Sequence, residues 1–283
     1  MNQSPLRIAS LVPSVTELVV ELGLAEALVA RTGFCIHPRA ALREVPKVGG
    51  TKDVDLRKLE GLAPTHLIVN VDENRRETVD AVRGWPRAPR IVVTHPMRPQ
   101  DNLALVAQML HVFRAHPGVP ERAQDLSQAL HRELALTGPE GRPLRRVLYL
   151  IWREPWMTIA RDTYLSRMLA RVNWQSLPQQ EGGPCGAARY PVLRGDESWL
   201  GEVDEVLLSS EPYRFTAAHL AHAQALCPAA RVRRVDGELL SWYGPRAIRG
   251  LRYLRRLAAT AADPSGDNPG FLFPGAEAPE ACP

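Results

Sequence analysis

The chain lacks the features of a disulfide-rich, zinc-binding or membrane-spanning protein. Its four cysteines, Cys35, Cys185, Cys227 and Cys282, form no close pair, so neither a disulfide framework nor a zinc ribbon is predicted. No apolar run approaches the ~20 residues of a membrane span. The N-terminus, MNQSPLRIASLVPS, has no charged segment followed by an apolar one, as a signal peptide would. As the chain stands, we therefore expect a cytoplasmic location; a periplasmic or membrane-associated one is the alternative if the true start lies upstream.

Lysine is also scarce, since only three lysines contribute to the 35 basic residues. The arginines are scattered and the formal net charge is +4, so we find no basic stripe and expect no nucleic-acid partner. The 283 residues are 45% hydrophobic and 23% charged, which is ordinary for a globular protein. The length allows one large domain or two lobes.

The first half of the chain alternates predicted strands and helices. An αβ alternation of this kind is typical of a parallel sheet covered by helices. The predicted strands are 7–12, 28–32, 66–70 and 90–95, and the predicted helices are 15–24, 56–62, 71–85 and 101–116.

The second half repeats the pattern. Segment 156–160 is expected to pair with the first strand as a hairpin, and 173–193, rich in Gly, Pro and Gln, is expected to be irregular. Beyond residue 263, a tail with five prolines is expected to be disordered or loosely attached. The predicted strands are 145–152, 205–209 and 231–235, and the predicted helices are 163–172, 196–203, 216–226 and 244–262.

One long helix separates the two halves. Pro120 suits a first helical turn, and Leu126, Leu130 and Leu134 recur every fourth residue to give one apolar stripe. We expect this helix to join two lobes, although an ordinary surface helix of one large domain is also compatible with the pattern. The predicted divisions are an N-terminal αβ lobe at 1–119, a linking helix at 120–138, a C-terminal αβ lobe at 139–262 and a tail at 263–283.

The predicted ligand site lies where the parallel strands end, because ligands gather outside the carboxyl ends of such strands. These ends are rich in aromatic rings, which offer flat, stiff surfaces to a large planar ligand, and in arginines that can pair with its polar edges. We expect about two of the five aromatic residues to belong to the core instead. The predicted ligand-binding residues are Phe34, Cys35, His37, Glu73, Asn74, Arg75, Trp152, Arg153, Trp156, Arg161, Glu211, Tyr213, Trp242 and Tyr243.

Cys35 and His37 are the soft metal ligands at close spacing. Two residues apart on an extended segment, they would point the same way and reach one metal. Two ligands are too few, so Glu73, His95 or Glu211 would have to complete a site. The alternatives are one axial ligand on a metal that is already chelated, or an incidental Cys-x-His.

The motifs reached so far resemble the cobalamin- and metal-chelate-binding proteins of ABC importers, also described as helical backbone metal receptors. The similar segments are RIASLVPSVTELVVELGL, PKVGGTKDVDLRKLEGLAPTHLIVN, FCIHP, DENR, IWREPWMTI, SEPYRF and SWYG. The resemblance runs to about Ala262. It implies an α/β fold of two Rossmann-like lobes with parallel sheets joined by a single long backbone helix. It also implies capture of a cobalamin-like or iron-chelate ligand between lobes that move little.

Two departures from the resembled family concern delivery to a transporter. Members that work at a membrane carry a secretion or lipoprotein signal, which this sequence does not show. They also present one carboxylate from each lobe to the permease, and Arg57 occupies the first of those positions. Glu60 is the expected substitute there, with Asp196 or Glu197 serving in the second lobe.

Our leading interpretation is a monomeric, non-enzymatic binding protein, without a catalytic cofactor, that captures a metal chelate for ABC-type uptake or intracellular binding. The second is an enzyme acting on such a compound, with Cys35 as nucleophile and His37 or His95 as base. Against it, the sequence has no GxSxG, phosphate-binding glycine loop or HExxH. The third is a partner-binding module whose cleft is vestigial.

Overall fold

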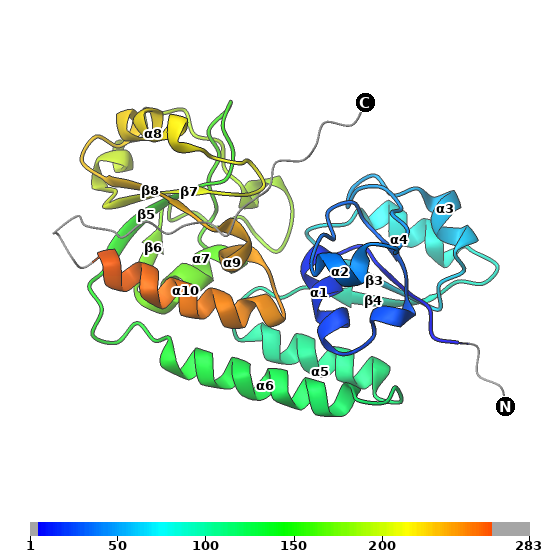
Figure 1. Cartoon of the computed structure of the whole chain (residues 1–283). Coiled ribbons are helices and arrows are strands. Elements are labelled where there is room, and N and C mark those ends of the chain that lie inside the picture. Colours follow the sequence, from blue (N-terminus) through cyan, green and yellow to red (C-terminus); the bar gives the residue numbers. More distant parts are fainter. Residues whose placement is uncertain (1–4, 262–283) are drawn as a thin grey trace.

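The computed structural model describes residues 5–261. It contains two four-stranded sheets, with strand orders β2-β1-β3-β4 and β6-β5-β7-β8, and every pairing within them is parallel. In each sheet the first strand lies between the second and third, so the two lobes share one topology (Figure 1). The predicted class of two αβ lobes is confirmed.

The N-terminal lobe follows the predicted order of elements closely. β3 has the predicted bounds, and the other strands differ by one or two residues at their ends, where pairing is weakest. Its strands are β1 (Ile8–Ser10), β2 (Leu28–Arg31), β3 (His66–Asn70) and β4 (Arg90–Thr94). Its helices are α1 (Pro13–Glu21), η1 (Ala25–Ala27), α2 (Arg39–Leu42), α3 (Leu56–Gly61), α4 (Arg76–Arg83) and α5 (Asp101–Phe113).

The C-terminal lobe departs from prediction in two places. Segment 173–193 is not wholly irregular, because it contributes the edge strand β6. Segment 156–160 forms no strand, although Met157 makes an isolated antiparallel bridge to Trp152, directly after β5, and another to Val192. The strands are β5 (Arg145–Leu150), β6 (Trp174–Ser176), β7 (Glu205–Ser209) and β8 (Arg231–Val235). The helices are α7 (Tyr164–Leu169), η2 (Ala170–Val172), η3 (Ala187–Arg189), η4 (Ser198–Glu202), η5 (Ala217–His219), α8 (Leu220–Leu226), α9 (Gly237–Ser241) and α10 (Pro245–Ala261).

The predicted linking helix is α6 (Val119–Leu136), which in the chain follows the strands of the first sheet and precedes those of the second. It lies along the base of the molecule (Figure 1). Its apolar stripe is buried at Ala123, Leu130 and Leu134 against α5 and α10. The exact divisions proposed for the lobes stay predictions. The predicted tail at 263–283 lies outside the described residues.

The lobes share a hydrophobic core along this helical base. One continuous cluster of buried side chains includes Leu18 of α1 and Met109 of α5 together with Met168 of α7 and Leu251 of α10. Each sheet also has a smaller cluster of its own on its other face. The lobes are therefore joined by packed side chains as well as by α6.

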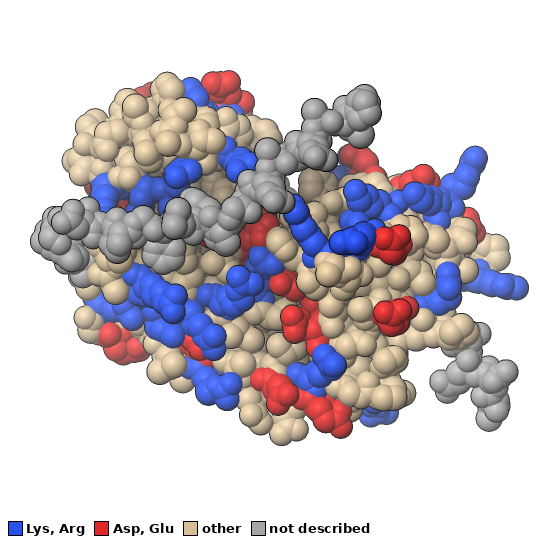
Figure 2. All heavy atoms as spheres, in the orientation of Figure 1, with Lys and Arg blue, Asp and Glu red and all other residues tan. Residues whose placement is uncertain are grey.

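Basic side chains gather over α10, where Arg249, Arg252 and Arg256 are exposed, and acidic side chains appear near the boundary between the lobes (Figure 2). The helical repeat brings these arginines, which are three and four residues apart, to one face of α10. No helix within residues 5–261 has both the length and the apolar character needed to cross a membrane.

Candidate functional site

A cavity of about 350 Å³ lies between the lobes, where β3, β5 and β7 end. Asp72 comes two residues after β3, Trp152 two residues after β5 and Glu211 two residues after β7. Among the described residues that line the cavity, Asp72 alone comes from the N-terminal lobe. This is the position at which parallel sheets commonly bind ligands.

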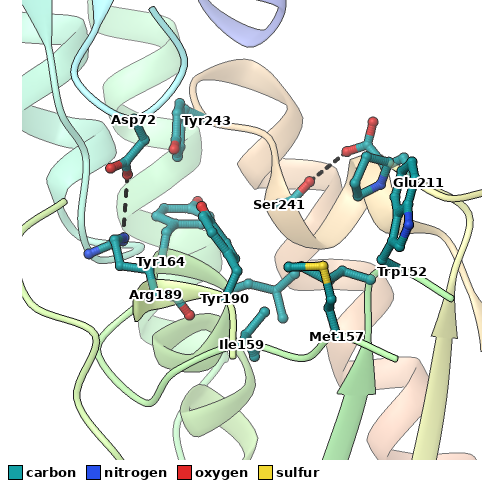
Figure 3. A pocket seen from close by; sticks show the side chains of 14 residues that line it. Asp72, Trp152, Met157, Ile159, Tyr164, Arg189, Tyr190, Glu211, Ser241 and Tyr243 are labelled. Carbon is teal, nitrogen blue, oxygen red and sulfur yellow. Dashed lines mark hydrogen bonds and ion pairs between the residues drawn. The ribbon is translucent and has the colours of Figure 1, made fainter. Parts of the chain in front are cut away.

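One wall of the cavity is aromatic and apolar. Trp152, Tyr190 and Tyr243 lie around it, and Met157 and Ile159 form its floor (Figure 3). The Trp152 side chain is 41% exposed although it is large and apolar. Flat rings that are held in place lose little conformational freedom when a planar ligand covers them, so this wall suits such a ligand.

One end of the cavity holds an ion pair that crosses between the lobes. Asp72 Oδ2 lies 3.5 Å from Arg189 Nη2 and 3.5 Å from His95 Nε2. The Arg189 side chain is almost completely buried, and its Nη1 donates a 2.8 Å hydrogen bond to the carbonyl oxygen of Gly183. Arg189 thus links the loop before it to Asp72 of the opposite lobe.

The other end of the cavity holds Glu211. Its Oε1 accepts hydrogen bonds from Ser241 Oγ at 2.7 Å and from Trp242 Nε1 at 2.8 Å. Burial raises the pKa of this carboxyl group, and the negative charge of Glu238 raises it further, while the two hydrogen bonds act in the opposite direction. The net result is a pKa above the usual range of a glutamate.

The carboxyl group of Glu73 interacts electrostatically with the acidic groups at both ends of the cavity. Burial raises its pKa to about 8, and the charges of Glu211 and Asp72 also raise it, while Lys52 opposes them. Two of these carboxyl groups follow β3 and the third follows β7. Carboxyl groups from both lobes therefore face one another across the cleft.

A second contact between the lobes consists of Glu17, His37, Glu238 and Arg246, which we call the interlobe ion-pair cluster. Arg246 of α10 donates to both oxygens of Glu17 in α1, at 2.7 and 2.9 Å, and also to Glu238. His37 Nε2 lies 3.0 Å from Glu238 Oε2. Burial alone would raise the pKa of Glu238, but the hydrogen bond from His37 and the nearby cations lower it overall. The cluster fastens the first helix of one lobe to the last helix of the other.

Five of the predicted ligand-binding residues lie in or directly against the cavity. Trp152, Glu211 and Tyr243 line it. Tyr213 packs edge-on against Trp152 with ring centroids 5.5 Å apart, and Trp242 donates to Glu211. Trp242 and Tyr243 are each only 8% exposed, although Tyr243 also lines the cavity.

Three C-terminal-lobe residues have structural partners outside the cavity. Trp156 stacks on Phe215 with centroids 6.0 Å apart, and the Arg153 guanidinium lies over the Trp156 ring at 5.7 Å. Arg161 pairs with Glu181 at 2.6 Å beside β6. The predicted contact of these three residues with the ligand does not fit the cavity.

The N-terminal-lobe predictions Phe34, Asn74 and Arg75 also lie outside the cavity lining. Asn74 is buried and holds the backbone of Asn70 and Leu11 through its side-chain amide. Arg75 is exposed and pairs with Asp53 at 3.1 Å. Phe34 is 62% exposed.

Cys35 and His37 do not form the predicted metal site. Cys35 is 0% exposed, and its Sγ contacts the hydroxyl groups of Thr16 at 3.1 Å and Thr32 at 3.2 Å. The His37 ring instead meets Glu238 of the opposite lobe. Within the described part of the chain, no group of three or more His, Cys, Asp or Glu side chains is placed to hold a metal ion. The segment is not extended throughout, because residues 33–34 form a turn and residues 37–38 a bend.

Sequence reasoning missed much of the cavity. Asp72 lies two residues after the predicted strand 66–70 but was passed over for its neighbour Glu73, and Arg189 and Tyr190 fall in the segment expected to be irregular. Tyr164 belongs to a predicted apolar helix and was therefore not singled out as a site residue. No periodic signal marks such loop residues, because their position depends on contacts with the other lobe.

The carboxylates predicted to meet a permease differ in availability. Glu60 and Asp196 are exposed. Glu197 instead accepts hydrogen bonds from the backbone N–H groups of Arg194 and Gly195 at 2.7 and 2.9 Å. Its carboxylate therefore stabilises its own loop.

Comparison with solved structures defines the class of fold. The chain superposes on the periplasmic vitamin B12-binding protein BtuF of Vibrio cholerae with a TM-score of 0.74 and 18% identity, covering 90% of this chain and 97% of that one. For the periplasmic haem-binding protein HutB of Vibrio cholerae the TM-score is 0.73, at 21% identity over 92% of this chain and 100% of HutB. The fold is thus the two-lobed fold of these periplasmic binding proteins.

A curated relative is similar over most of the chain. It is the uncharacterized ABC transporter substrate-binding lipoprotein YvrC of Bacillus subtilis (strain 168), 21% identical over 271 residues, or 90% of this chain and 80% of the relative. A periplasmic haem-binding protein of Pseudomonas aeruginosa is similar in structure, with a TM-score of 0.72 and 24% identity over 92% of this chain and 95% of that one. No protein-family model matches the chain.

Proposed function

We propose that the protein is a substrate-binding protein that captures a cobalamin-like compound or another metal chelate, of the haem or siderophore type, between its lobes. The observation that carries the proposal is the interlobe cavity, in which an aromatic wall from one lobe faces a carboxylate from the other. The volume of about 350 Å³ is within the usual ~300–1,000 Å³ of small-molecule sites. The similar structures bind vitamin B12 and haem, which supports the same class of ligand.

The test is a fluorescence titration of the purified protein with cobalamin, cobinamide, haem and ferric chelates. We expect saturable quenching of tryptophan fluorescence at one equivalent by a compound of this set. Trp152→Ala should weaken binding at least tenfold with the fold intact, because the exposed ring forms part of the wall. Trp85→Ala is the matched control, since Trp85 lies in a separate groove of the N-terminal lobe. The proposal would be contradicted if no compound quenched the fluorescence, or if the two variants lost ligand affinity equally.

An enzymatic function through Cys35 receives no support from the geometry. Burial raises the pKa of the Cys35 thiol despite opposing hydrogen bonds from Thr16 and Thr32, which disfavours the reactive thiolate. The thiol is also closed to solvent. We therefore infer stoichiometric binding without turnover, which product analysis after prolonged incubation with each chelate would check.

We further propose delivery of the ligand to an ABC permease through Glu60 of one lobe and Asp196 of the other. Both carboxylates are exposed, whereas Arg57 and Glu197 fit the role less well because of charge and of existing hydrogen bonds. Replacing Glu60 and Asp196 with lysine should abolish stimulation of the cognate transporter ATPase and leave ligand affinity unchanged. If the stimulation of the ATPase is unchanged in this variant, neither residue belongs to the docking surface.

The similar proteins also bear on the location of this one. Because YvrC is called a lipoprotein and BtuF and HutB periplasmic, we propose that the protein works outside the cytoplasmic membrane, which was the alternative expectation. Fractionation of cells that naturally make the protein, followed by immunoblotting, would test this. Recovery in the cytosolic fraction alone would restore the first expectation.

A further inference from the structure

The cavity combines an apolar wall with an excess of acidic groups. Asp72 and Glu211 line it from opposite lobes, and Glu73 lies close enough to both for their charges to affect its pKa. Arg189 is the one basic side chain among the lining residues, and it faces Asp72. A ligand thus meets more negative than positive charge.

The acidic groups retain capacity to accept hydrogen bonds. Both side-chain hydrogen bonds that Glu211 receives from described residues end on Oε1, which leaves Oε2 for a further donor. Asp72 Oδ2 has Arg189 and His95 at 3.5 Å, which is longer than the ~2.9 Å of a strong N–H···O bond. N–H groups of a ligand would therefore find acceptors at both ends of the cavity.

A carboxylate on the ligand would meet the opposite situation. In a partly buried site, a further negative charge within a few ångströms of Glu211 or Asp72 is repelled strongly, because the surrounding medium screens the charges poorly. Either the ligand or the protein would have to take up a proton before the two could approach. An amide of the same shape carries no such cost.

We propose that the cavity selects a chelate whose rim carries N–H donors, as carboxamide or ammonium groups do, and discriminates against one whose rim carries carboxylates. Asp72 and Glu211, which line the cavity, set this selectivity from opposite lobes. The inference rests on the proposed function, since it specifies the chemistry of the ligand for that same cavity.

The experiment uses two pairs of probes that differ only in their rims. Dicyanocobinamide and dicyanocobyrinic acid share the corrin ring and cobalt but present mainly amides and carboxylates, respectively. Haem and its dipropionamide form the corresponding porphyrin pair. The dissociation constant of each probe is measured by tryptophan quenching, and the ratio of carboxylate to amide form is compared within each pair.

In the unmodified protein we expect the amide form to bind at least tenfold tighter in the pair that fits the cavity. The ratio should fall at least fivefold in the Asp72→Asn/Glu211→Gln double variant, which replaces both lining carboxyl groups with amides of nearly the same shape. Glu211→Gln alone should lower it in the same direction and serves if the double variant does not fold. Glu181→Gln is the control, since Glu181 pairs with Arg161 outside the cavity.

A carboxylate form that binds the unmodified protein as tightly as its amide partner would overturn the inference, and so would a ratio that the glutamine variants leave unchanged. Either result would leave the proposed capture of a chelate intact. Failure of all four probes and of the ferric chelates to bind would instead overturn the proposed function, and this inference with it.

Discussion

The two lobes have the same strand order but contribute differently to the cavity. The C-terminal lobe supplies the aromatic and apolar wall, including Trp152 and Tyr243, whereas the N-terminal lobe supplies Asp72, with Glu73 beside it. Repetition of the fold places strand ends at the cleft twice. The side chains that follow those strands differ between the lobes. The C-terminal lobe mainly sets the shape of the cavity, and both lobes contribute to its charge.

The contacts between the lobes differ in a similar way. The interlobe ion-pair cluster is centred on the buried Arg246–Glu17 pair, with hydrogen bonds of 2.7 and 2.9 Å, whereas Asp72 and Arg189 approach only to 3.5 Å. We infer that the cluster and the helical base hold the lobes together. The contact beside the cavity should contribute less to the unfolding free energy. Variants at these contacts test this difference.

Arg246→Met should have the largest effect. It leaves Glu17 buried without its cation, and breaking a buried pair in this way costs about 3–5 kcal/mol of unfolding free energy. Urea unfolding at neutral pH measures the loss. Arg256→Met is the matched control on the exposed face of α10 and should change stability by less than about 0.5 kcal/mol. Equal effects of the two substitutions would contradict the role given to the cluster.

Arg189→Met should cost less, about 2 kcal/mol, because the lost contact to Asp72 is long and His95 remains beside that carboxylate. The same unfolding experiment gives the value. A loss larger than that of Arg246→Met would reverse the comparison, since the contact beside the cavity would then be the stronger link between the lobes.

Glu133→Gln should have a smaller effect that depends on pH. Burial raises the pKa of Glu133, but hydrogen bonds from Arg252 and Arg255 of α10 outweigh burial and lower it overall. The charged form is therefore the stabilising one. At pH 7 the unfolding free energy of the unmodified protein should be about 1–2 kcal/mol larger than that of the variant. This difference should shrink as the pH falls below about 4.5 and the carboxylate becomes protonated.

Unfolding curves at pH 7 and pH 3.5 would measure this difference, with Asp125→Asn on the exposed side of α6 as control. A difference that persists unchanged at the lower pH would mean that the carboxylate charge is not what joins α6 to α10.

The regular elements could be predicted because their signals are local. The strand at His66–Asn70 and the apolar stripe of α6 follow from residue spacing alone. The short edge strand β6 could not, since three residues in a loop rich in Gly and Pro carry no periodicity. Such a strand forms because β5 offers it a partner.

The site was predicted less completely because its residues meet only through tertiary contacts. Trp152, Glu211 and Tyr243 were found because they lie at or beside the ends of elements that the pattern located. Arg189 was missed because its burial depends on Asp72 in the other lobe. Cys35 was misassigned since the spacing to His37 does not reveal that the turn directs the thiol into the core.

The most direct test of the account is a crystal structure of the protein with dicyanocobinamide. We expect the ring to lie against Trp152 in the cavity between the lobes, with amide nitrogens of its rim within hydrogen-bonding distance of Glu211 or Asp72. A ligand bound elsewhere, for example in the groove beside Trp85, would contradict the account.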